Sequence, residues 1–175
     1  MKNNQLFWGD GRGGFTEVTD DPSTMAGGNT YYAIVVDVDM DSLPDLYVSN
    51  KDANNQLFLG SGAGRVFAQV MEGPAVEGGG MTYMTAVADF DNDNFPDLFL
   101  TNYDQKNAFL TADGSLVHHD VTDAAPGEAD SSKSKHAASA DINNDGHKRP
   151  AICYDLHNSV IFTSFWPSNS SIAGL

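Results

Sequence analysis

The chain is poor in positive charge. Its 175 residues hold nine Lys and Arg against 24 Asp and Glu, which gives a formal net charge of −15 at pH 7. Nucleic-acid backbones and anionic membrane surfaces are bound through clustered Lys and Arg side chains. The composition therefore argues against a nucleic-acid partner and against docking on anionic membranes.

Cysteine is almost absent as well. Cys153 is the single cysteine, so no disulfide can form within the chain. It lies in an apolar segment, residues 151–154, where a free cysteine packs as a small hydrophobic residue. A reducing compartment is therefore allowed, and so is an extracellular one in which bound metal replaces disulfides.

Long apolar runs and amphipathic helical patterns are also missing. No segment approaches the length of a transmembrane helix, and the first residues lack the apolar stretch of a signal peptide. The five histidines have none of the spacings typical of zinc sites, and no nucleophile-elbow or Ser-His-Asp pattern occurs. We therefore predict no membrane insertion, no visible targeting signal and no enzymatic activity.

What the sequence does contain is a repeated acidic loop. Residues 37–45 read DVDMDSLPD and residues 89–97 read DFDNDNFPD, so each loop has carboxylates at positions 1, 3, 5 and 9. Four acidic side chains in nine residues repel one another unless a cation lies among them. Oxygen ligands alone suit a hard divalent cation, and Ca2+ is the usual one.

Two calcium sites are predicted, each from one loop. The expected ligands are side-chain oxygens at positions 1, 3, 5 and 9 and the main-chain carbonyl at position 7. For the first loop these are Asp37, Asp39, Asp41, Asp45 and the Leu43 carbonyl, and for the second Asp89, Asp91, Asp93, Asp97 and the Phe95 carbonyl. The EF-hand also begins this way, but it requires a bidentate Glu at position 12. Here position 12 is Val48 or Leu100, so the EF-hand is disfavoured.

A third copy of the loop departs from the pattern. It starts at residue 141, so the loops beginning at 37, 89 and 141 are 52 residues apart. Its candidate ligands are Asp141, Asn143, Asp145 and His147, but position 9 is Arg149, which cannot bind a metal. We predict that this site is weak or empty and that a neighbouring cation replaces the metal. A local patch for an acidic partner is the alternative.

Other elements recur in phase with the loops. The sequence Asn-Gln-Leu-Phe at residues 4–7 returns at 55–58, with looser copies at 107–110 and 158–161, and a Gly-rich turn follows the first two copies. Each period reads as four short strands, which fits one blade of a β-propeller. We predict an all-β fold of four-stranded antiparallel blades, about three and a half in number, forming an open arc or part of a larger ring. The expected units are a half blade over 1–29, complete blades over 30–80 and 81–132, and an incomplete blade over 133–175.

These motifs together resemble the FG-GAP/VCBS repeat. The Asp loop between apolar strands, the Asn-x-Leu-Phe element and the Gly-rich hairpin are similar to those of integrin-alpha-type propellers and cartilage acidic protein-type propellers. The resemblance implies a propeller whose loops hold Ca2+ and an extracellular or luminal location. It does not imply one activity, because the repeat occurs in adhesion, lectin and enzyme-associated proteins.

The predicted function is a calcium-stabilised interaction module with a structural metal. Protein contacts are expected on the connections between blades, residues 20–29, 71–80 and 123–134, where the repeats differ most. Exposed blade edges favour self-association or assembly in a larger complex, and the chain can also be a fragment of a longer propeller. The alternative is a carbohydrate-binding or enzyme-associated propeller that takes a glycan near the axis.

Overall fold

The computed structural model describes residues 3–25, 28–62, 66–77, 80–114, 118–124, 133–141, 144–146, 149–154 and 159–161, the last two ranges by their backbone alone. Nearly every regular element in these ranges is a short strand. The strands are β1 (Leu6–Gly9), β2 (Phe15–Val18), β3 (Asn29–Val36), β4 (Asp45–Lys51), β5 (Gln56–Ser61), β6 (Val66–Val70), β7 (Thr82–Ala88), β8 (Asp97–Asn102), β9 (Ala108–Thr111), β10 (His119–Asp120), β11 (Ser134–Ala140), β12 (Arg149–Tyr154) and β13 (Ser159–Ile161).

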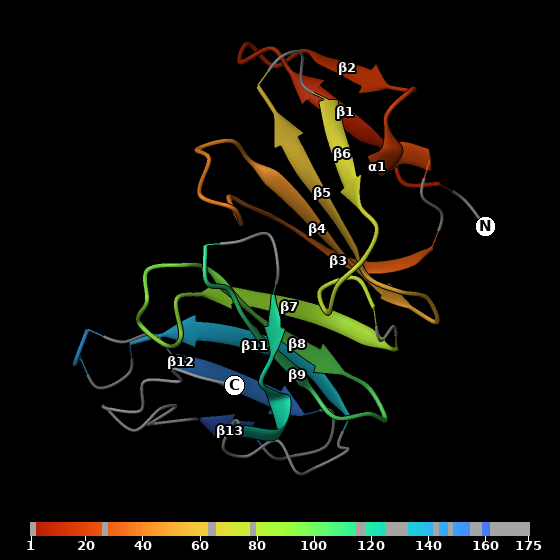
Figure 1. Cartoon of the computed structure of the whole chain (residues 1–175). Helices are drawn as coiled ribbons and strands as arrows, with labels where there is room; N and C mark the ends of the chain where they lie inside the picture. The colour runs from red at the N-terminus through yellow and green to blue at the C-terminus, as the bar shows by residue number, and fades with distance from the viewer. Residues whose placement is uncertain are drawn as a thin grey trace.

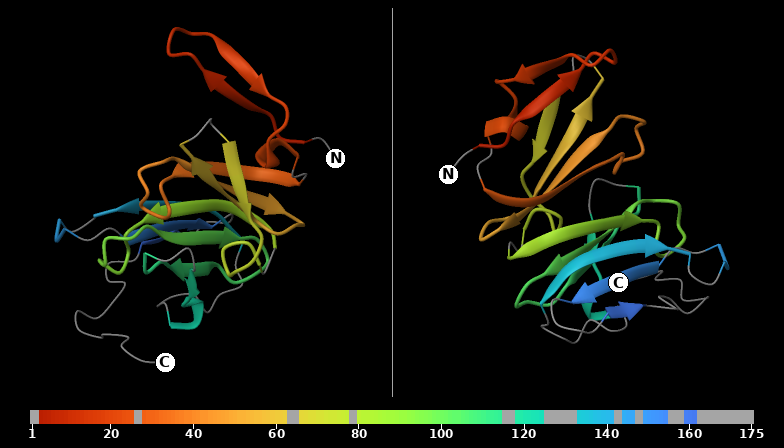
Figure 2. Two further views of the ribbon diagram at one scale, coloured as in Figure 1. Left: turned by 45° about the horizontal axis from the view of Figure 1, so that its top comes forward. Right: turned by 180° about the vertical axis from the view of Figure 1, so that it is seen from behind.

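The strands form four separate sheets. β3 to β6 and β7 to β10 form four-stranded sheets, β1 pairs with β2, and β11 to β13 form a three-stranded sheet. Within each sheet, strands that follow one another in the sequence are antiparallel neighbours. The prediction of an all-β fold built from four-stranded antiparallel blades is therefore confirmed (Figure 1). The sheets stack one on another, and the described part of the chain closes no ring (Figure 2).

The hydrophobic core lies between the sheets. Trp8 of β1 stacks on Phe67 of β6, with ring centroids 5.9 Å apart. The next interface joins Tyr47 and Leu57 of one four-stranded sheet to Leu98 and Leu110 of the other. The third packs Phe99 and Phe109 against Ala137 of β11. Since each sheet is covered by its neighbour in the sequence, the alternating apolar strands are buried without any long helix.

Two short helices interrupt the strands in the described ranges, and no sequence pattern predicted either of them. They are α1 (Pro22–Met25) and the 3-10 helix η1 (Thr122–Ala124). Asp21 precedes α1, and one of its carboxylate oxygens accepts a hydrogen bond from the Ser23 amide at 2.9 Å. The other oxygen accepts one from the Phe67 amide of β6, also at 2.9 Å. This buried carboxylate therefore ties the connection after β2 to the outer strand of the next sheet.

The repeated asparagine of the Asn-x-Leu-Phe element joins each sheet to the next one. The Asn55 side-chain oxygen accepts from the Asn50 amide at 2.9 Å within its own sheet. Its amide nitrogen donates to the Thr82 hydroxyl at 3.0 Å, and Thr82 in turn donates to the Asn102 side-chain oxygen at 2.8 Å. The same arrangement recurs one sheet earlier with Asn4 and Thr30 and one sheet later with Asn107 and Ser134. The repeat thus holds neighbouring blades together through buried polar bridges.

Replacing Asn55 with alanine is expected to lower the free energy of unfolding by about 2–3 kcal/mol. The change leaves the buried Asn50 amide without its acceptor and removes a donor to Thr82, and each buried unsatisfied group costs about 1–3 kcal/mol. Denaturant unfolding at constant calcium measures the effect. Asn3→Ala, at an exposed asparagine, serves as the control, and we expect it to change stability by less than about 0.5 kcal/mol. An equal loss in both variants would contradict the role of the bridge.

Candidate metal centre

Each acidic loop connects the first strand of a sheet to the second. Residues 37–45 lead from β3 into β4, and residues 89–97 lead from β7 into β8. Asp45 and Asp97, at loop position 9, are the first residues of the second strands and have no exposed surface. Val48 and Leu100, at position 12, are buried inside these strands, so neither loop has the exiting helix or the glutamate of an EF-hand.

The folding of each loop brings together the carboxylates at positions 1, 3 and 9. In the first loop, one oxygen from each of Asp37, Asp39 and Asp45 lies within 4.8 Å of the others. In the second loop the same holds for Asp89, Asp91 and Asp97. Two congruent oxygen triads therefore occupy equivalent places in consecutive blades, and their donor set fits a hard cation such as Ca2+.

The carboxylates also fold the loops that carry them. Asp37 accepts hydrogen bonds from the amides of Asp41 and Ser42, at 3.0 and 2.9 Å. Asp41 accepts one from the Leu43 amide at 2.7 Å. Asp89 and Asp93 make the same contacts in the second loop. These hydrogen bonds fix the turns of both loops. The ligand roles of Asp41, Asp93 and the carbonyls of Leu43 and Phe95 stay predictions.

The third loop has the same turn at its start. Asp141 accepts hydrogen bonds from the amides of Asp145 and Gly146, at 3.1 and 2.8 Å. Asn143 and His147 and the side chain of Arg149 lie outside the described residues, so the predicted weak site stays a prediction. At residues 141 and 144–146, the described start of this loop therefore makes the same hydrogen-bonded turn as the other two loops.

Left-handed backbone recurs at positions 4 and 6 of each loop. Position 6 holds Ser42, Asn94 and Gly146, with φ of 71°, 75° and 89°. The need for positive φ at this position could be read from Gly146 and Asn94 in the sequence. Position 4 has φ of 62° in Met40, 69° in Asn92 and 57° in Asn144. Asn92 and Asn144 suit this backbone and were the available signal in the sequence, whereas Met40 gives none.

Ser42→Gly is expected to raise the free energy of unfolding by about 0.5 kcal/mol. A non-glycine residue with left-handed backbone costs about 1–2 kcal/mol, and glycine removes this strain. Glycine also raises the conformational entropy of the unfolded chain, which offsets part of the gain in stability. Ser61→Gly, in strand β5, is the matched comparison and should lower stability by roughly 0.5–1 kcal/mol. Thermal unfolding of the two variants checks the opposite signs. A loss of stability in Ser42→Gly would show that the serine side chain contributes more than its backbone costs.

The carboxylate at position 9 has a second duty that the sequence did not reveal. Asp97 accepts hydrogen bonds from the Phe90 amide at 2.7 Å, inside the loop, and from the Ala112 amide at 3.0 Å, just after β9. Asp45 does the same with Val38 and Gly60, at 2.7 and 2.8 Å. Each of these residues therefore clamps the metal loop to the third strand of its own blade.

The clamp needs close backbone approach in the first blade. A Cβ atom on Gly60 would lie 2.3 Å from the Pro44 carbonyl oxygen, so only glycine fits there. The side chains at position 7 pack nearby, with Leu43 against Gly62 and Phe95 against Gly114. The glycines at and after the end of the third strand therefore make room for the metal loop to pack against it.

Burial makes the ionised triads unfavourable without a cation. Burial, reinforced by repulsion from Asp91 and Asp93, raises the pKa of Asp97 to about 7. Burial and repulsion from Asp93 raise the pKa of Asp91 to about 6. Burial is also the main cause that raises the pKa of Asp39 and of Asp45 in the first loop. A divalent cation within the triad would relieve this repulsion and keep the carboxylates ionised.

Comparison with known proteins agrees with the repeat. No curated protein matches the chain. A family model, the FG-GAP-like repeat, matches twice, over residues 37–100 and over residues 89–148. Each match begins at the first aspartate of an acidic loop, and together they cover more than half of the sequence. The chain therefore belongs to the FG-GAP-like repeat family.

Proposed function

We propose that this protein is a calcium-binding β-propeller module that mediates protein–protein contacts, with the metal in a structural role. The observation that carries the proposal is the pair of congruent carboxylate triads in consecutive blades. FG-GAP repeats are generally non-enzymatic interaction modules and are typically extracellular. Extracellular calcium concentrations would fill such sites, and filled sites would stabilise the blades that present the partner surface.

The residues of each loop have distinct roles in this proposal. Asp37, Asp39 and Asp45, and likewise Asp89, Asp91 and Asp97, would supply carboxylate oxygens. Asp41 and Asp93 would complete the ligand sets, with the carbonyls of Leu43 and Phe95. The bound ion supplies positive charge that holds the loop closed, and the chain's own residues set where the loop meets the third strand. Metal binding is then coupled to the stability of each blade.

Calcium titration of metal-free protein tests the proposal, read by calorimetry and by native mass. We expect two Ca2+ per chain, falling to one in Asp39→Ala and to one in Asp91→Ala, because alanine removes the ligand oxygen that asparagine would keep. These positions are chosen because their side chains make no hydrogen bond to another strand of the described residues. Asp10→Ala is the control, since Asp10 accepts hydrogen bonds from the amides of Arg12 and Gly14 in an exposed turn between β1 and β2. No bound calcium, or an equal loss of calcium in Asp10→Ala, would refute the assignment.

The third loop is proposed to bind calcium weakly or not at all. Arg149 stands where the other loops have Asp45 and Asp97, so one ligand and one clamp are replaced by a cation. Arg149→Asp is therefore expected to bind one more Ca2+ than the parent chain. An unchanged stoichiometry would contradict the replacement.

The partner surface is proposed on the connections between blades, residues 20–29, 71–80 and 123–134. We also propose the division into a half blade (1–29), two blades (30–80 and 81–132) and an incomplete blade (133–175), whose edges would associate with a partner or a second copy. No helix in the described part of the chain is long and apolar enough to cross a membrane. Native mass in calcium and after chelation measures the assembly, and a change from a complex to a single chain on chelation is the expected result.

A further inference from the structure

A row of tyrosines lies at the starts of β3 and β7 and at the end of β8, which is the edge of these sheets opposite the metal loops. Tyr31 and Tyr83 stack with ring centroids 4.4 Å apart and planes 14° from parallel. Tyr103, just after β8, lies 5.4 Å from Tyr83. Tyr31 ends the row and is 45% exposed. The metal loops follow the C-terminal ends of β3 and β7, whereas the row lies at their starts, so the two features do not share residues.

The row arises from a backbone irregularity repeated in three blades. The pairing of the first two strands shifts register between Thr30 and Tyr32, between Thr82 and Met84, and between Ser134 and His136. The residues within these shifts are Tyr31, Tyr83 and Lys135. A bulge re-aims a side chain. It lets the preceding Thr or Ser join the buried Asn bridge while the next side chain joins the row.

Lysines gather around these tyrosines although the chain is strongly acidic. The Lys133 ammonium lies 5.1 Å from the Tyr103 ring centroid. The Lys135 ammonium lies 5.8 Å from the Tyr83 ring and 5.7 Å from the Tyr103 ring. Lys51 lies at the other end of the row, where it and Tyr31 line the same pocket. Three of the nine Lys and Arg residues of the chain are therefore placed along one line of aromatic rings.

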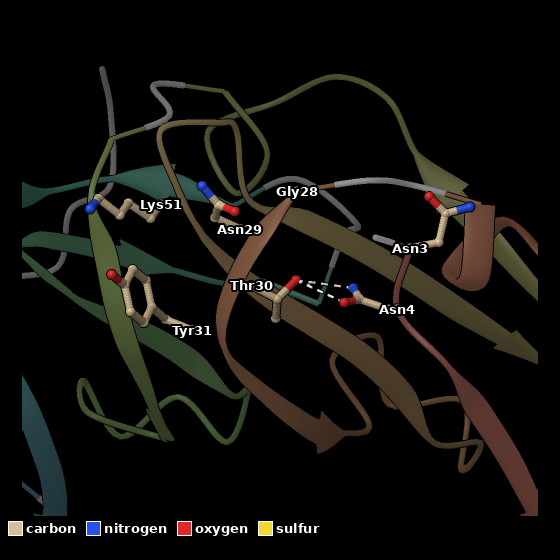
Figure 3. A pocket seen from close by; sticks show the side chains of 7 residues that line it. All are labelled: Asn3, Asn4, Gly28, Asn29, Thr30, Tyr31 and Lys51. Atoms are coloured by element: carbon tan, nitrogen blue, oxygen red, sulfur yellow. Dashed lines mark hydrogen bonds between the residues drawn. The ribbon is translucent and has the colours of Figure 1, made fainter. Parts of the chain in front are cut away.

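A polar pocket of about 560 Å³ adjoins the exposed end of the row. In Figure 3, Tyr31, Asn29 and Lys51 line one side of the pocket, and Asn3 and Asn4 line the other. The Asn4 amide nitrogen donates to the Thr30 hydroxyl at 3.0 Å, and the single hydroxyl proton goes to the side-chain oxygen of either Asn4 or Asn50, at 3.1 or 3.0 Å. The pocket thus offers amide and hydroxyl groups, an aromatic ring and a cation within one open hollow.

We propose that this pocket and the tyrosine row bind an acidic saccharide. A sugar ring has an apolar face of C–H groups that packs on a tyrosine ring, and its hydroxyls pair with amide side chains such as Asn29 and Asn3. The carboxylate of a uronic acid, or a sulfate, would pair with Lys51, and further acidic units with the lysines along the row. Cationic side chains at both ends favour an anionic ligand over a neutral one.

Binding of an oligogalacturonate to the calcium-loaded chain tests this site, with a neutral galactose oligomer and a poly-glutamate peptide as comparison ligands. We expect the uronate to bind at least tenfold more tightly than either. Tyr31→Ala and Lys51→Gln should each weaken uronate binding at least tenfold. Phe15→Ala removes an aromatic ring that is 74% exposed and lies outside the row, and it should leave binding unchanged.

Several results would overturn the proposal. The first is that no uronate binds. The second is that poly-glutamate binds equally well, which would mean that charge alone determines binding. The third is uronate binding that persists in both Tyr31→Ala and Lys51→Gln. Calcium stoichiometry and thermal stability are measured on each sample. A variant that loses saccharide binding but keeps its bound calcium and melting temperature supports the site. If the parent chain binds calcium but no saccharide, the saccharide proposal fails and the proposed calcium function is unaffected.

Discussion

Replacing Asp97 with alanine is expected to lower the free energy of unfolding by about 3–5 kcal/mol and to abolish the second calcium site. The fully buried carboxylate accepts hydrogen bonds from the Phe90 and Ala112 amides, at 2.7 and 3.0 Å. Leaving a buried donor unsatisfied costs about 1–3 kcal/mol, and here two are left. The loop and the strand after it lose their common anchor at the same time, so blade and metal site should fail together.

The asparagine variant separates the two duties of this residue. Asp97→Asn keeps the shape and one acceptor oxygen, but its NH2 group faces an amide donor, so we expect an intermediate loss of about 1–2 kcal/mol. Asp123→Ala, at an exposed aspartate of the same blade that forms a surface ion pair with Lys106, should cost less than about 1 kcal/mol. Denaturant unfolding with and without calcium gives all three values. An alanine variant within 1 kcal/mol of the parent would mean that the clamp is not structural.

Most of the fold could be predicted from the length of the sequence repeat. The Asp loops and the Asn-x-Leu-Phe element both repeat about every 52 residues, and together they predicted the four-stranded blades. A loop and a strand motif that keep a constant spacing imply the same order of strands and turns in every repeat. The same period located the acidic triads. What spacing did not disclose is that Asp45 and Asp97 also bind the backbone of the third strand, since that contact joins residues 15 positions apart through a buried side chain.

The tyrosine row and the Asn bridges were missed for a different reason. Asn55 and Thr82 are 27 residues apart, and their contact exists only when one blade packs on the next. The direction of Tyr31 and Tyr83 depends on bulges, and a bulge reverses the alternation from which strand faces are predicted. Local patterns therefore determine the blades, whereas the surface between them depends on how the blades stack.

The stability of the metal-free protein is expected to fall as the pH rises from 4 to 8. Asp97 has a folded-state pKa of about 7 and an ordinary value of 3.8, so the folded protein holds this proton more tightly than the unfolded chain. Its contribution is complete below pH 3.8 and is lost as the pH rises through 7. The difference corresponds to a change on the order of 4 kcal/mol, and Asp91, with a pKa of about 6, acts in the same direction.

Calcium is expected to reverse this dependence. A bound ion requires ionised carboxylates, so protons compete with it and the calcium-loaded protein should lose stability as the pH falls below 7. His118 is buried, and burial lowers its pKa to about 4, so its protonation favours unfolding below pH 6.5. This contribution is the same in the calcium-loaded and the metal-free protein, so it cancels when their stabilities are compared. Denaturant unfolding from pH 4 to 8, in calcium and in chelator, measures the two slopes. Asp97→Asn should flatten the slope in chelator, and parallel slopes in the parent protein would contradict calcium binding by these carboxylates.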